Sequence, residues 1–340
     1  GIPCFGPRKA AAAIEGSKAF AKELMSKYGI PTAAYEVFTE LDAALRYLDT
    51  APVPTVVKAD GLALGKGVII ASTREEAKNA VISMMKDKVF GESGASVVIE
   101  EFLTGPEVSV LSFTDGKTLV PMVSSMDHKR ALDGDRGLNT GGMGTVAPNP
   151  YYTKETADEC MEKIFLPTIR AMNAEGRTFK GCLYFGLMLT ENGPKVIEYN
   201  CRFGDPETQV VLPLLKSDLY TVMRATTDGT LDKADVEFSE GAACCVIEAS
   251  SGYPQKYASG FPITLPDKYK DNVYVAGAKT ADGKLLTSGG RVLGVTATAD
   301  TLENAVKAAY EIVPHITFEN AYYRTDIGAK ALAAIGKKEN

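Results

Sequence analysis

The sequence predicts an α+β protein that ends in a small, separate α+β domain. Helical and strand patterns are mixed along the chain, without the regular strand-helix-strand alternation of a parallel sheet. The 340 residues suffice for two or three compact units, at roughly 100 to 200 residues per domain. Apolar residues form 45% of the chain and charged residues 24%, which are ordinary proportions for a soluble globular protein.

Apolar spacing and turn residues define the elements of the first third. The segment 16–28 is followed by Gly29 and Pro31, which are typical helix stop signals. Two β-branched segments enclose a glycine-rich turn at 61–66 and are expected to pair as a hairpin. The predicted helices are 16–28, 41–48 and 74–85, and the predicted strands are 55–59, 67–71, 97–102 and 107–113.

The remaining chain begins with a long predicted loop at 127–148, whose five glycines exceed what a passive connection needs. The polar segment 227–240 is expected to be a linker between a first unit, 1–226, and a C-terminal α+β domain, 241–340. The predicted helices here are 153–174, 208–224 and 302–313, and the predicted strands are 182–189, 196–200, 243–249, 273–278 and 291–298.

Composition excludes several classes of protein. Apolar stretches are strand-sized, whereas a membrane-spanning helix takes about 20 apolar residues, so no membrane partner is expected. No signal peptide is visible at the start, which favours a cytoplasmic location. The six cysteines lack CxxC spacing and are expected to be reduced thiols. A net charge of -6 argues against nucleic acid as a partner and permits a local cationic site.

The glycine-rich turn is a candidate phosphate site. A P-loop has four residues between its glycines and Ser or Thr after its lysine, whereas three residues separate Gly61 from Gly65 and Gly67 follows Lys66. The pattern therefore favours a hairpin that folds over phosphates, with Lys58 and Lys66 on either side of a triphosphate. A structural β-turn with solvated lysines is the alternative explanation.

An acidic pattern follows at the next predicted strand. Glu100 and Glu101 precede Leu103, and Glu107 lies seven residues after Glu100 across a turn. This spacing suits recognition of an adenine edge, by backbone groups at Glu101 and Leu103, and then of a ribose diol. Acidic residues at strand ends are common, so the pattern is weak by itself.

Glu198 and Asn200 form the strongest candidate metal site. Alternation along a strand places residues i and i+2 on one face, so two oxygen ligands point the same way. Magnesium, or manganese, prefers such ligands and takes others from phosphate and water. One half-exposed strand face is the alternative. Arg202 follows directly and is the candidate catalytic residue, because it can neutralise charge on a transferring phosphoryl group.

Two motifs flank the long loop, Asp127 to Arg130 and Asn139 to Gly144. His128 is a weak candidate for a general base, since a lone histidine is more often structural or solvated. No nucleophile elbow is present, and no cysteine lies in an obvious catalytic context.

In this order, the lysine pair around a glycine hairpin, the Glu100 to Glu107 pattern and the late Glu-x-Asn resemble the ATP-grasp superfamily. More narrowly, the sequence is similar to the glycinamide ribonucleotide synthetase family over nearly its whole length. The residues that carry the resemblance are Gly16 to Phe20, Lys58 to Leu62, Gly65 to Gly67, Asp127 to Arg130, Asn139 to Gly144 and Arg202 to Glu207. Members of that family carry an additional N-terminal domain, which is expected to be missing from a chain that starts Gly-Ile-Pro.

The resemblance implies an ATP-grasp fold, in which two α+β subdomains clasp ATP, followed by the small C-terminal α+β domain. Residues 55–115 are then expected to form the mobile lid. The implied ATP-binding residues are Lys18, Lys58, Gly61, Gly65, Lys66, Gly67, Glu100, Glu101, Leu103 and Glu107, and the implied metal ligands are Glu198 and Asn200. The implied substrate-binding residues are Asp127, Lys129, Asn139, Thr140, Gly141, Gly142, Gly204, Asp205, Pro206 and Glu207.

The implied activity is ATP-dependent ligation of glycine to 5-phosphoribosylamine in purine biosynthesis, through a glycyl phosphate. ATP would be the co-substrate, Mg²⁺ or Mn²⁺ the metal, and the enzyme would be a monomer. Many ATP-grasp enzymes have a third acidic metal ligand on the preceding strand, where this sequence has Gly186 to Met188. The alternatives are another purine-pathway ATP-grasp ligase or carboxylase, and an ATP-binding fragment without turnover.

Overall fold

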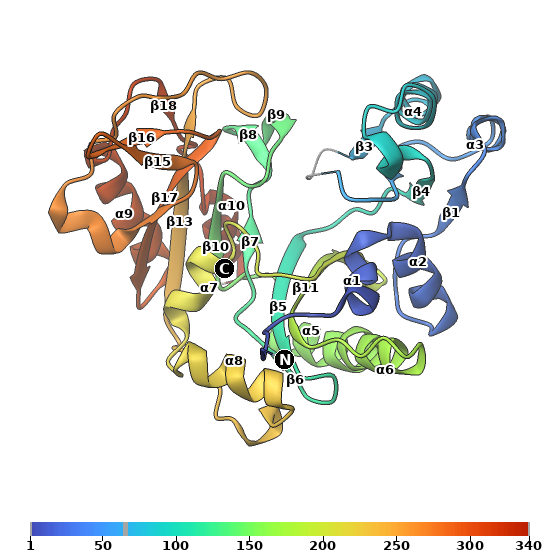
Figure 1. Cartoon of the computed structure of the whole chain (residues 1–340), viewed down its shortest axis with the longest axis horizontal. Helices are drawn as coiled ribbons and strands as arrows, with labels where there is room; N and C mark the ends of the chain where they lie inside the picture. The colour runs from blue at the N-terminus through green and yellow to red at the C-terminus, as the bar shows by residue number, and fades with distance from the viewer. Residues whose placement is uncertain (1, 64–66, 339–340) are drawn as a thin grey trace.

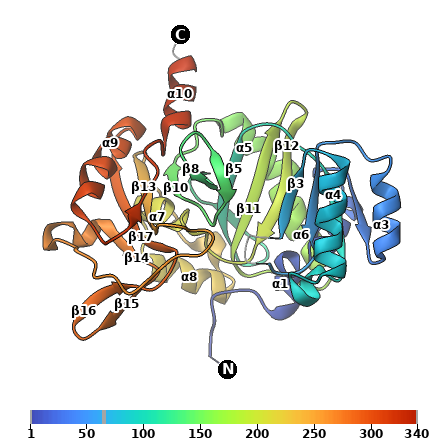
Figure 2. The ribbon, with the colours of Figure 1, turned by 90° about the horizontal axis from the view of Figure 1, so that it is seen from above.

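A computed structural model describes residues 2–63 and 67–338 of the chain. Within these residues the strands form three larger sheets and two small hairpins. Figure 1 shows the N-terminal lobe with α3 and α4 at one side, the C-terminal lobe with α9 and β13 to β18 at the other, and β5 and β11 between them. Figure 2 shows the same order from above. No helix in the described part of the chain is long and apolar enough to cross a membrane.

The first sheet forms the small lobe that carries the glycine-rich turn. Its antiparallel order is β1 (Tyr35–Phe38), β4 (Val97–Glu101), β2 (Thr55–Ala59) and β3 (Val68–Ala71). Val57 and Ile99 pack on the apolar stripes of the two covering helices. Those helices are α3 (Leu41–Leu48) and α4 (Arg74–Val81), and the latter runs into a π-helical turn at Ile82–Lys86. A 3₁₀ turn, Gly91–Gly94, precedes β4.

The central sheet has the order β12 (Gly193–Asn200), β11 (Gly181–Thr190), β5 (Glu107–Thr114) and β6 (Leu119–Pro121). Alternation along β11 sends Leu183 and Phe185 into one core and Cys182 and Tyr184 into another. The first core is covered by α1 (Lys9–Gly16), α2 (Lys18–Lys27), α5 (Lys154–Cys160), a π turn (Met161–Phe165) and α6 (Leu166–Ala174).

The C-terminal sheet packs against the second core through α7 (Thr208–Val211) and α8 (Leu219–Asp228). Its order is β14 (Val273–Val275), β17 (Arg291–Ala299), β13 (Ala242–Ser250), β10 (Gly144–Ala147) and β7 (Met126–Asp127), with β18 (Ala321–Tyr322) also on β13. Its other face carries α9 (Leu302–Ile312) and α10 (Ala329–Lys338). The hairpins are β8 (Arg130–Leu132) with β9 (Arg136–Asn139), and β15 (Ala278–Ala281) with β16 (Lys284–Thr287). Four 3₁₀ turns lie at Leu212–Leu214, Leu231–Lys233, Asp267–Asn272 and Val313–His315.

The predicted loop at 127–148 differs most from the structure. It contains β8, β9 and β10, and two strands from this region, β7 and β10, join the C-terminal sheet. Val146 pairs with Cys244, far along the chain. Sequence separation conceals this partnership, so a boundary drawn only at 227–240 leaves out two strands of the C-terminal sheet, β7 and β10. The expected linker is itself ordered, with Leu231 fully buried.

The expected lid bounds of 55–115 also differ from the structure. The small sheet includes β1 and ends with β4, whereas β5 belongs to the central sheet, so residues 35–101 form this lobe. Both connections are tied to the central sheet. The Val196 N–H donates to Pro31 O over 2.8 Å, and the Leu189 N–H donates to Pro106 O over 3.0 Å.

Several smaller expectations were wrong at element ends. The helix predicted at 208–224 is interrupted, because Pro213 lies in a 3₁₀ turn and a new helix, α8, begins after its N-cap Asp218. The elements that the sequence did not predict also include α1, β1, β6, β16, β18 and α10. Short or edge elements of this kind have few local signals.

His128 joins the 127–148 segment to the C-terminal domain. It is 3% exposed, its Nε2 accepts from the Gly328 N–H over 3.2 Å, and its Nδ1 therefore carries the proton donated to Gly144 O over 3.1 Å. Burial, with the nearby Arg324 charge, lowers the pKa of His128 to about 4. This histidine is a structural residue.

We predict that the free energy of unfolding falls between pH 6.5 and 4 because of His128. The unfolded chain takes up a proton near pH 6.5, while the folded chain stays neutral down to about 4. The contribution is complete above this window and is lost as the pH falls through it, by on the order of 3 kcal/mol. Denaturant unfolding at several pH values measures the slope.

His128→Gln should reduce that slope, and the exposed His315 offers the matched control, since the chain has two histidines. Equal slopes for parent and His128→Gln would contradict the assignment.

Candidate functional site

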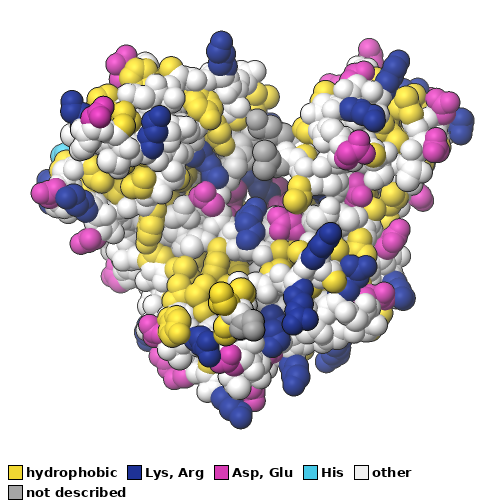
Figure 3. Space-filling view, in the orientation of Figure 1, with side chains coloured by type: hydrophobic (Ala, Val, Ile, Leu, Met, Phe, Trp, Pro, Cys, Tyr) yellow, Lys and Arg dark blue, Asp and Glu magenta, His cyan; other side chains and the backbone are white. Residues whose placement is uncertain are grey.

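The predicted residues converge between the small lobe, the edge of the central sheet and the segments 127–144 and 202–207. Figure 3 shows the surface hollowed between the two upper lobes, with basic and acidic side chains gathered in the hollow. The charged groups are near enough to shift one another's pKa. The charges of Lys58 and Glu198 act on the pKa of Lys18. The charges of Glu107, Glu198 and Asp127 act on the pKa of Lys129. The structure thus brings separate sequence motifs into one site.

A buried carboxylate organises the lysines. Glu100 on β4 is 4% exposed. Its carboxylate forms ion pairs with Lys22 Nζ at 3.1 Å and with Lys58 Nζ at 3.0 Å. Lys58 Nζ also donates to the Ile197 carbonyl on β12 over 3.0 Å. Burial lowers the pKa of Lys22 to about 8 despite the Glu100 charge. Glu100 therefore holds the lysines in place, and Lys22 is a site residue that the sequence analysis missed.

Lys18 lies at the start of α2, against the glycine-rich turn. Its Nζ donates to Gly61 O over 2.9 Å, and burial together with the Lys58 charge lowers its pKa. The turn is tied to the same helix because Asp60 accepts from Ser17 Oγ at 3.0 Å and from the Ala19 N–H at 2.7 Å. Lys18 and Lys58 are thus brought together as expected.

Two glycines of the turn are required by close contacts. A Cβ at Gly61 would lie 2.6 Å from Ser93 Oγ, and one at Gly67 would lie 2.5 Å from the Ala63 Cβ. Gly65 and Lys66, which the sequence analysis assigned to ATP phosphates, lie outside the described residues.

Glu198 and Asn200 share one face of β12, as the alternation predicts. Tyr199 between them is 4% exposed and faces the opposite core, where its OH lies 2.9 Å from Thr168 Oγ1. Gly186 pairs with Glu198 across the ladder, and a Cβ there would lie 2.8 Å from Glu198 Cγ. The Glu198 side chain thus fills the space beside Gly186, where a side chain on β11 would otherwise lie.

This donor set fits a magnesium ion that is also bound by phosphate. Glu198 and Asn200 supply a carboxylate and an amide oxygen, the ligands that hard cations prefer. No group of three or more His, Cys, Asp or Glu residues in the described part of the chain is placed to hold a metal. The pair therefore leaves most coordination positions to phosphate oxygens and water.

Arg202 is exposed and lies beside this pair. Its Nη2 donates to Asn200 Oδ1 over 3.4 Å, and its Nη1 donates to Phe203 O over 2.9 Å. The guanidinium is therefore adjacent to the candidate metal ligands, where its charge can act on a phosphoryl group.

The segment 102–106 connects the two sheets. Glu101 before it accepts from the Ala34 N–H at 3.2 Å and pairs with Lys195 at 3.5 Å. Gly105 within it has a φ of +147°, and a Cβ there would lie 2.0 Å from Leu189 O. Leu103 precedes this glycine and is partly buried. The structure thus places the two predicted adenine-binding residues at a tightly packed crossing.

Glu107 forms an ion pair with Lys129. The sequence predicted that Glu107 binds ATP and that Lys129 binds the other substrate, so the pair was unexpected. Lys129 Nζ lies 2.7 Å from Glu107 Oε2. The Lys129 charge lowers the pKa of Glu107. Burial works against the Lys129 charge, but Glu107, Glu198 and Asp127 together raise the pKa of this lysine, which stays protonated. The salt bridge connects the expected ATP and substrate regions.

Asp127 and Glu207 lie close enough to couple electrostatically. Removal from water raises the pKa of both, and the Glu207 charge contributes to the shift at Asp127. Glu207 accepts from Tyr184 OH at 3.1 Å and Ser109 Oγ at 3.5 Å, and Thr145 Oγ1 donates to Asp127 at 3.4 Å. Tyr184 is a further residue that sequence analysis missed.

The glycine motif shapes the loop around these acids. Thr140 Oγ1 donates to Lys129 O over 2.9 Å and accepts from the Gly142 N–H over 2.9 Å, so it fixes the loop. Asn139, at the end of β9, pairs with Arg130 and is exposed. Gly204 is required because a Cβ would lie 2.3 Å from Glu207 Oε2.

Arg291 joins this loop to the 202–207 segment, and the sequence analysis missed it. Its Nη1 donates to Gly141 O at 2.9 Å and Asp205 O at 2.8 Å, and its Nη2 pairs with the Asp205 carboxylate at 3.2 Å. The signal was weak, because Arg291 follows a Gly-Gly turn far along the chain. Lys22 had a clearer signal, since it follows Lys18 by one helical turn.

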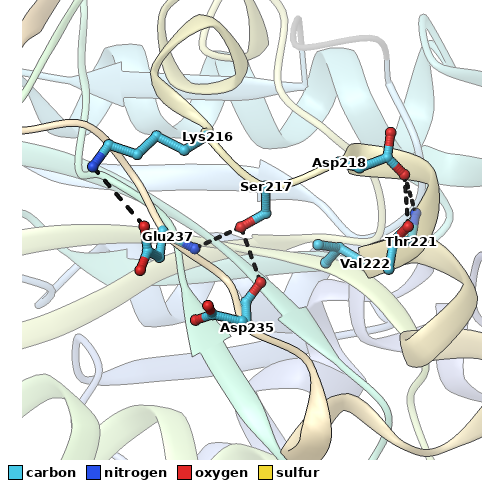
Figure 4. Close-up of a pocket in the computed structure, with 7 residues that line it drawn as sticks. All are labelled: Lys216, Ser217, Asp218, Thr221, Val222, Asp235 and Glu237. Atoms are coloured by element: carbon cyan, nitrogen blue, oxygen red, sulfur yellow. Dashed lines mark hydrogen bonds and ion pairs between the residues drawn. The ribbon is translucent and has the colours of Figure 1, made fainter.

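A different pocket of about 310 Å³ lies beside α8 (Figure 4). Ser217 Oγ accepts from the Glu237 N–H and donates to Asp235 O, while Lys216 points toward Glu237. It is lined by Lys216, Ser217, Asp218, Thr221, Val222, Asp235 and Glu237. None of the predicted site residues lines it, so it is separate from the site above.

Comparisons with known proteins cover nearly the whole chain. It is 49% identical over 330 residues to the phosphoribosylamine–glycine ligase of Caldanaerobacter subterraneus subsp. tengcongensis, covering 97% of this chain and 79% of that protein. The crystal structure of phosphoribosylamine–glycine ligase from Thermotoga maritima superposes with a TM-score of 0.87 at 39% identity, over 95% of this chain and 81% of that chain.

A biotin carboxylase complex from Campylobacter jejuni shares the fold, with a TM-score of 0.74 at 15% identity over 100% of this chain and 73% of that one. Family models of phosphoribosylglycinamide synthetase match twice: the ATP-grasp (A) domain at residues 16–208 and the C domain at 243–330. The ATP-grasp fold expected from the sequence is thereby confirmed. The chain belongs to the phosphoribosylglycinamide synthetase family.

Proposed function

We propose that this chain joins glycine to 5-phosphoribosylamine with ATP, forming glycinamide ribonucleotide, ADP and phosphate. The observation that carries the proposal is the meeting of Lys18, Lys58 and Lys129 with Glu198 between the small lobe and the central sheet. This arrangement supplies cations for a triphosphate next to an oxygen-ligand pair for its metal. Family membership supports the choice of substrates.

The nucleotide would lie between the hairpin of the small lobe and β12. Lys18 and Lys58 would contact the phosphates, while Glu101 and Leu103 at the crossing would face adenine and Glu107 the ribose. Lys58 already donates to the Ile197 carbonyl of β12, which lies 139 residues further along the chain. Small motions of the lobe would therefore move this lysine relative to the metal ligands.

Glu198 and Asn200 would hold the magnesium or manganese ion, which when bound supplies positive charge to the phosphate oxygens. The protein residues do the positioning. Arg202, beside Asn200, would face the phosphoryl group in transfer and offset the charge that develops on it. Little proton transfer is needed in this half of the reaction.

The chemistry is activation of a poor acyl donor. A glycine carboxylate oxygen attacks the γ-phosphorus, the bond to the ADP oxygen breaks, and glycyl phosphate forms. The amine nitrogen of 5-phosphoribosylamine then attacks the acyl carbon, phosphate leaves, and the nitrogen loses a proton as the amide forms. Alignment of the reactants is the main task of such a site.

The substrate half would lie along Asp127, Lys129, Gly141, Gly142 and the 204–207 segment. Burial raises the pKa of Asp127 and of Glu207, and an ammonium group such as that of glycine, bound between them, would favour their charged forms. We also propose that the enzyme acts as a monomer in the cytoplasm, in keeping with a pathway of small soluble metabolites.

The proposed activity predicts ADP formation that requires both glycine and freshly prepared 5-phosphoribosylamine. ADP is measured by a coupled assay and the amide product by mass spectrometry. Omission of either substrate is the control. ADP formed without the amide, or bicarbonate acting in place of glycine, would favour a different ATP-grasp reaction, and ATP binding with no turnover would favour a binding protein.

Lys58→Met should weaken ATP binding by about 10- to 100-fold, because a charged hydrogen-bond donor to phosphate contributes roughly 1.5 to 3 kcal/mol. Methionine keeps much of the side-chain length, and Lys22 continues to pair with Glu100. Isothermal titration calorimetry measures the affinity. Lys78→Met is the matched control, since this lysine of the same lobe pairs with Asp49 at the surface. Equal ATP affinity of Lys58→Met and the parent would remove Lys58 from the phosphate site.

Glu198→Gln should raise the magnesium concentration for half-maximal turnover by at least about tenfold. Even the loss of a group that only orients a metal ligand typically lowers metal affinity by about 10- to 100-fold. The amide keeps the shape but loses the charge. Glu191→Gln, at the exposed turn before the same strand, is the control. Superimposable metal titrations of Glu198→Gln and the parent would argue that the ion lies elsewhere.

A further inference from the structure

Arg291 lies where the C-terminal domain meets two loops of the site. Its backbone belongs to β17, where it pairs with Ala249 on β13, and its carbonyl accepts from the Gly277 N–H over 2.9 Å. Its side chain is 19% exposed. A well-held strand residue thus projects a largely covered guanidinium away from its own sheet.

The guanidinium binds both loops at once. Nη1 donates to the carbonyls of Gly141 at 2.9 Å, Gly142 at 3.4 Å and Asp205 at 2.8 Å, and Nη2 donates to Asp205 Oδ2 at 3.2 Å. The two loops lie more than 60 residues apart in the sequence, and Arg291 is a further 86 residues beyond Asp205. The Arg291 side chain therefore joins two loops that are far apart in the sequence.

The glycines allow the loop to lie against this guanidinium. A Cβ at Gly141 would lie 2.8 Å from Arg291 Nη2. Gly142 has a φ of +114°, and a Cβ there would lie 2.5 Å from Pro206 Cδ and 2.6 Å from Asp127 Oδ1. The glycine loop thus lies between Arg291 on one side and Asp127 and Pro206 on the other.

This stacking sets the position of the two coupled acids. Asp127 contacts the glycine loop on one side, and Glu207 follows directly after Pro206 on the other. Tyr253 OH adds a second contact from the same domain by accepting from the Gly141 N–H over 3.0 Å. The distance between Asp127 and Glu207 therefore depends on how closely the two loops are drawn together.

The nucleotide half does not use this arginine. Lys18 is held by Gly61, and Lys58 by Glu100 and Ile197, through the contacts described above. These residues belong to the small lobe, α2 and β12. The two halves of the site are consequently held by different interactions.

We infer that Arg291 is a positioning residue that sets the substrate half of the site by holding the Gly141 and Gly142 loop against Asp205 to Glu207. The expected change in kcat/KM rests on the proposed function, whereas the expected change in loop structure rests on the contacts alone. Arginine suits the task because its planar fork reaches several acceptors together, whereas a lysine ammonium is a point charge on a flexible stem.

The experiment compares Arg291→Ala, Arg291→Lys and the parent chain. Arg291→Ala should lower kcat/KM for glycine by about 100-fold, the scale of a small misplacement of reacting groups, with the ATP dissociation constant unchanged. Arg291→Lys should recover only part of the loss, and added guanidinium ion should partly restore Arg291→Ala. Arg224→Ala, which removes an exposed ion pair to Asp228 on α8, is the matched control and should match the parent.

Hydrogen exchange gives a readout that needs no turnover. Arg291→Ala should exchange faster in residues 139–144 and 203–207 and at the parental rate in 193–200. Unchanged exchange in both loops would overturn the inference, as would a parallel loss of ATP affinity, which would show a general structural role. If the parent itself lacks ligase turnover, the proposed function fails, while the exchange experiment still decides whether Arg291 positions the loops.

Discussion

The buried ion cluster of Lys22, Glu100 and Lys58 is the interaction on which the nucleotide half of the site depends. It connects α2, the sheet of the small lobe and, through Ile197, the central sheet. Ions removed from water are stabilised only by good partners, and loss of one partner from such a group typically costs about 3 to 5 kcal/mol. Two cations share one carboxylate here, so the cluster retains positive charge that a polyphosphate would offset.

The segment from Met126 to Ala147 has the corresponding role in the substrate half. It leaves the central sheet, adds β7 and β10 to the C-terminal sheet, and carries the motif residues between the two. His128 and Arg324 fasten it from the C-terminal side, since Arg324 binds Asp135 at 2.9 Å and Arg130 O at 3.1 Å. The C-terminal domain is therefore part of the framework of the site.

Local signals account for what the sequence predicted well. Alternation identified Glu198 and Asn200 on one strand face, and turn glycines identified the hairpin near Gly61. Arg291 and the strand pairing of Val146 with Cys244 were missed because both depend on partners distant in the sequence. The ion pairs of Glu100 with Lys22 and Lys58 were not predicted, because burial between two lysines leaves no trace in local composition. The single helix predicted at 208–224 was wrong although the signal against it was local. Its apolar spacing suggested one helix, but Pro213 breaks the helix there.

Gly186 has a consequence for how the metal would enter and leave. Because the Glu198 side chain fills the space beside it, Gly186 leaves no room for a second acidic side chain at this position. A pair of protein ligands made of one carboxylate and one amide has little hold on a bare divalent ion. The ion would then travel as part of the nucleotide complex, so that exchanging ADP for ATP renews the metal in the same event.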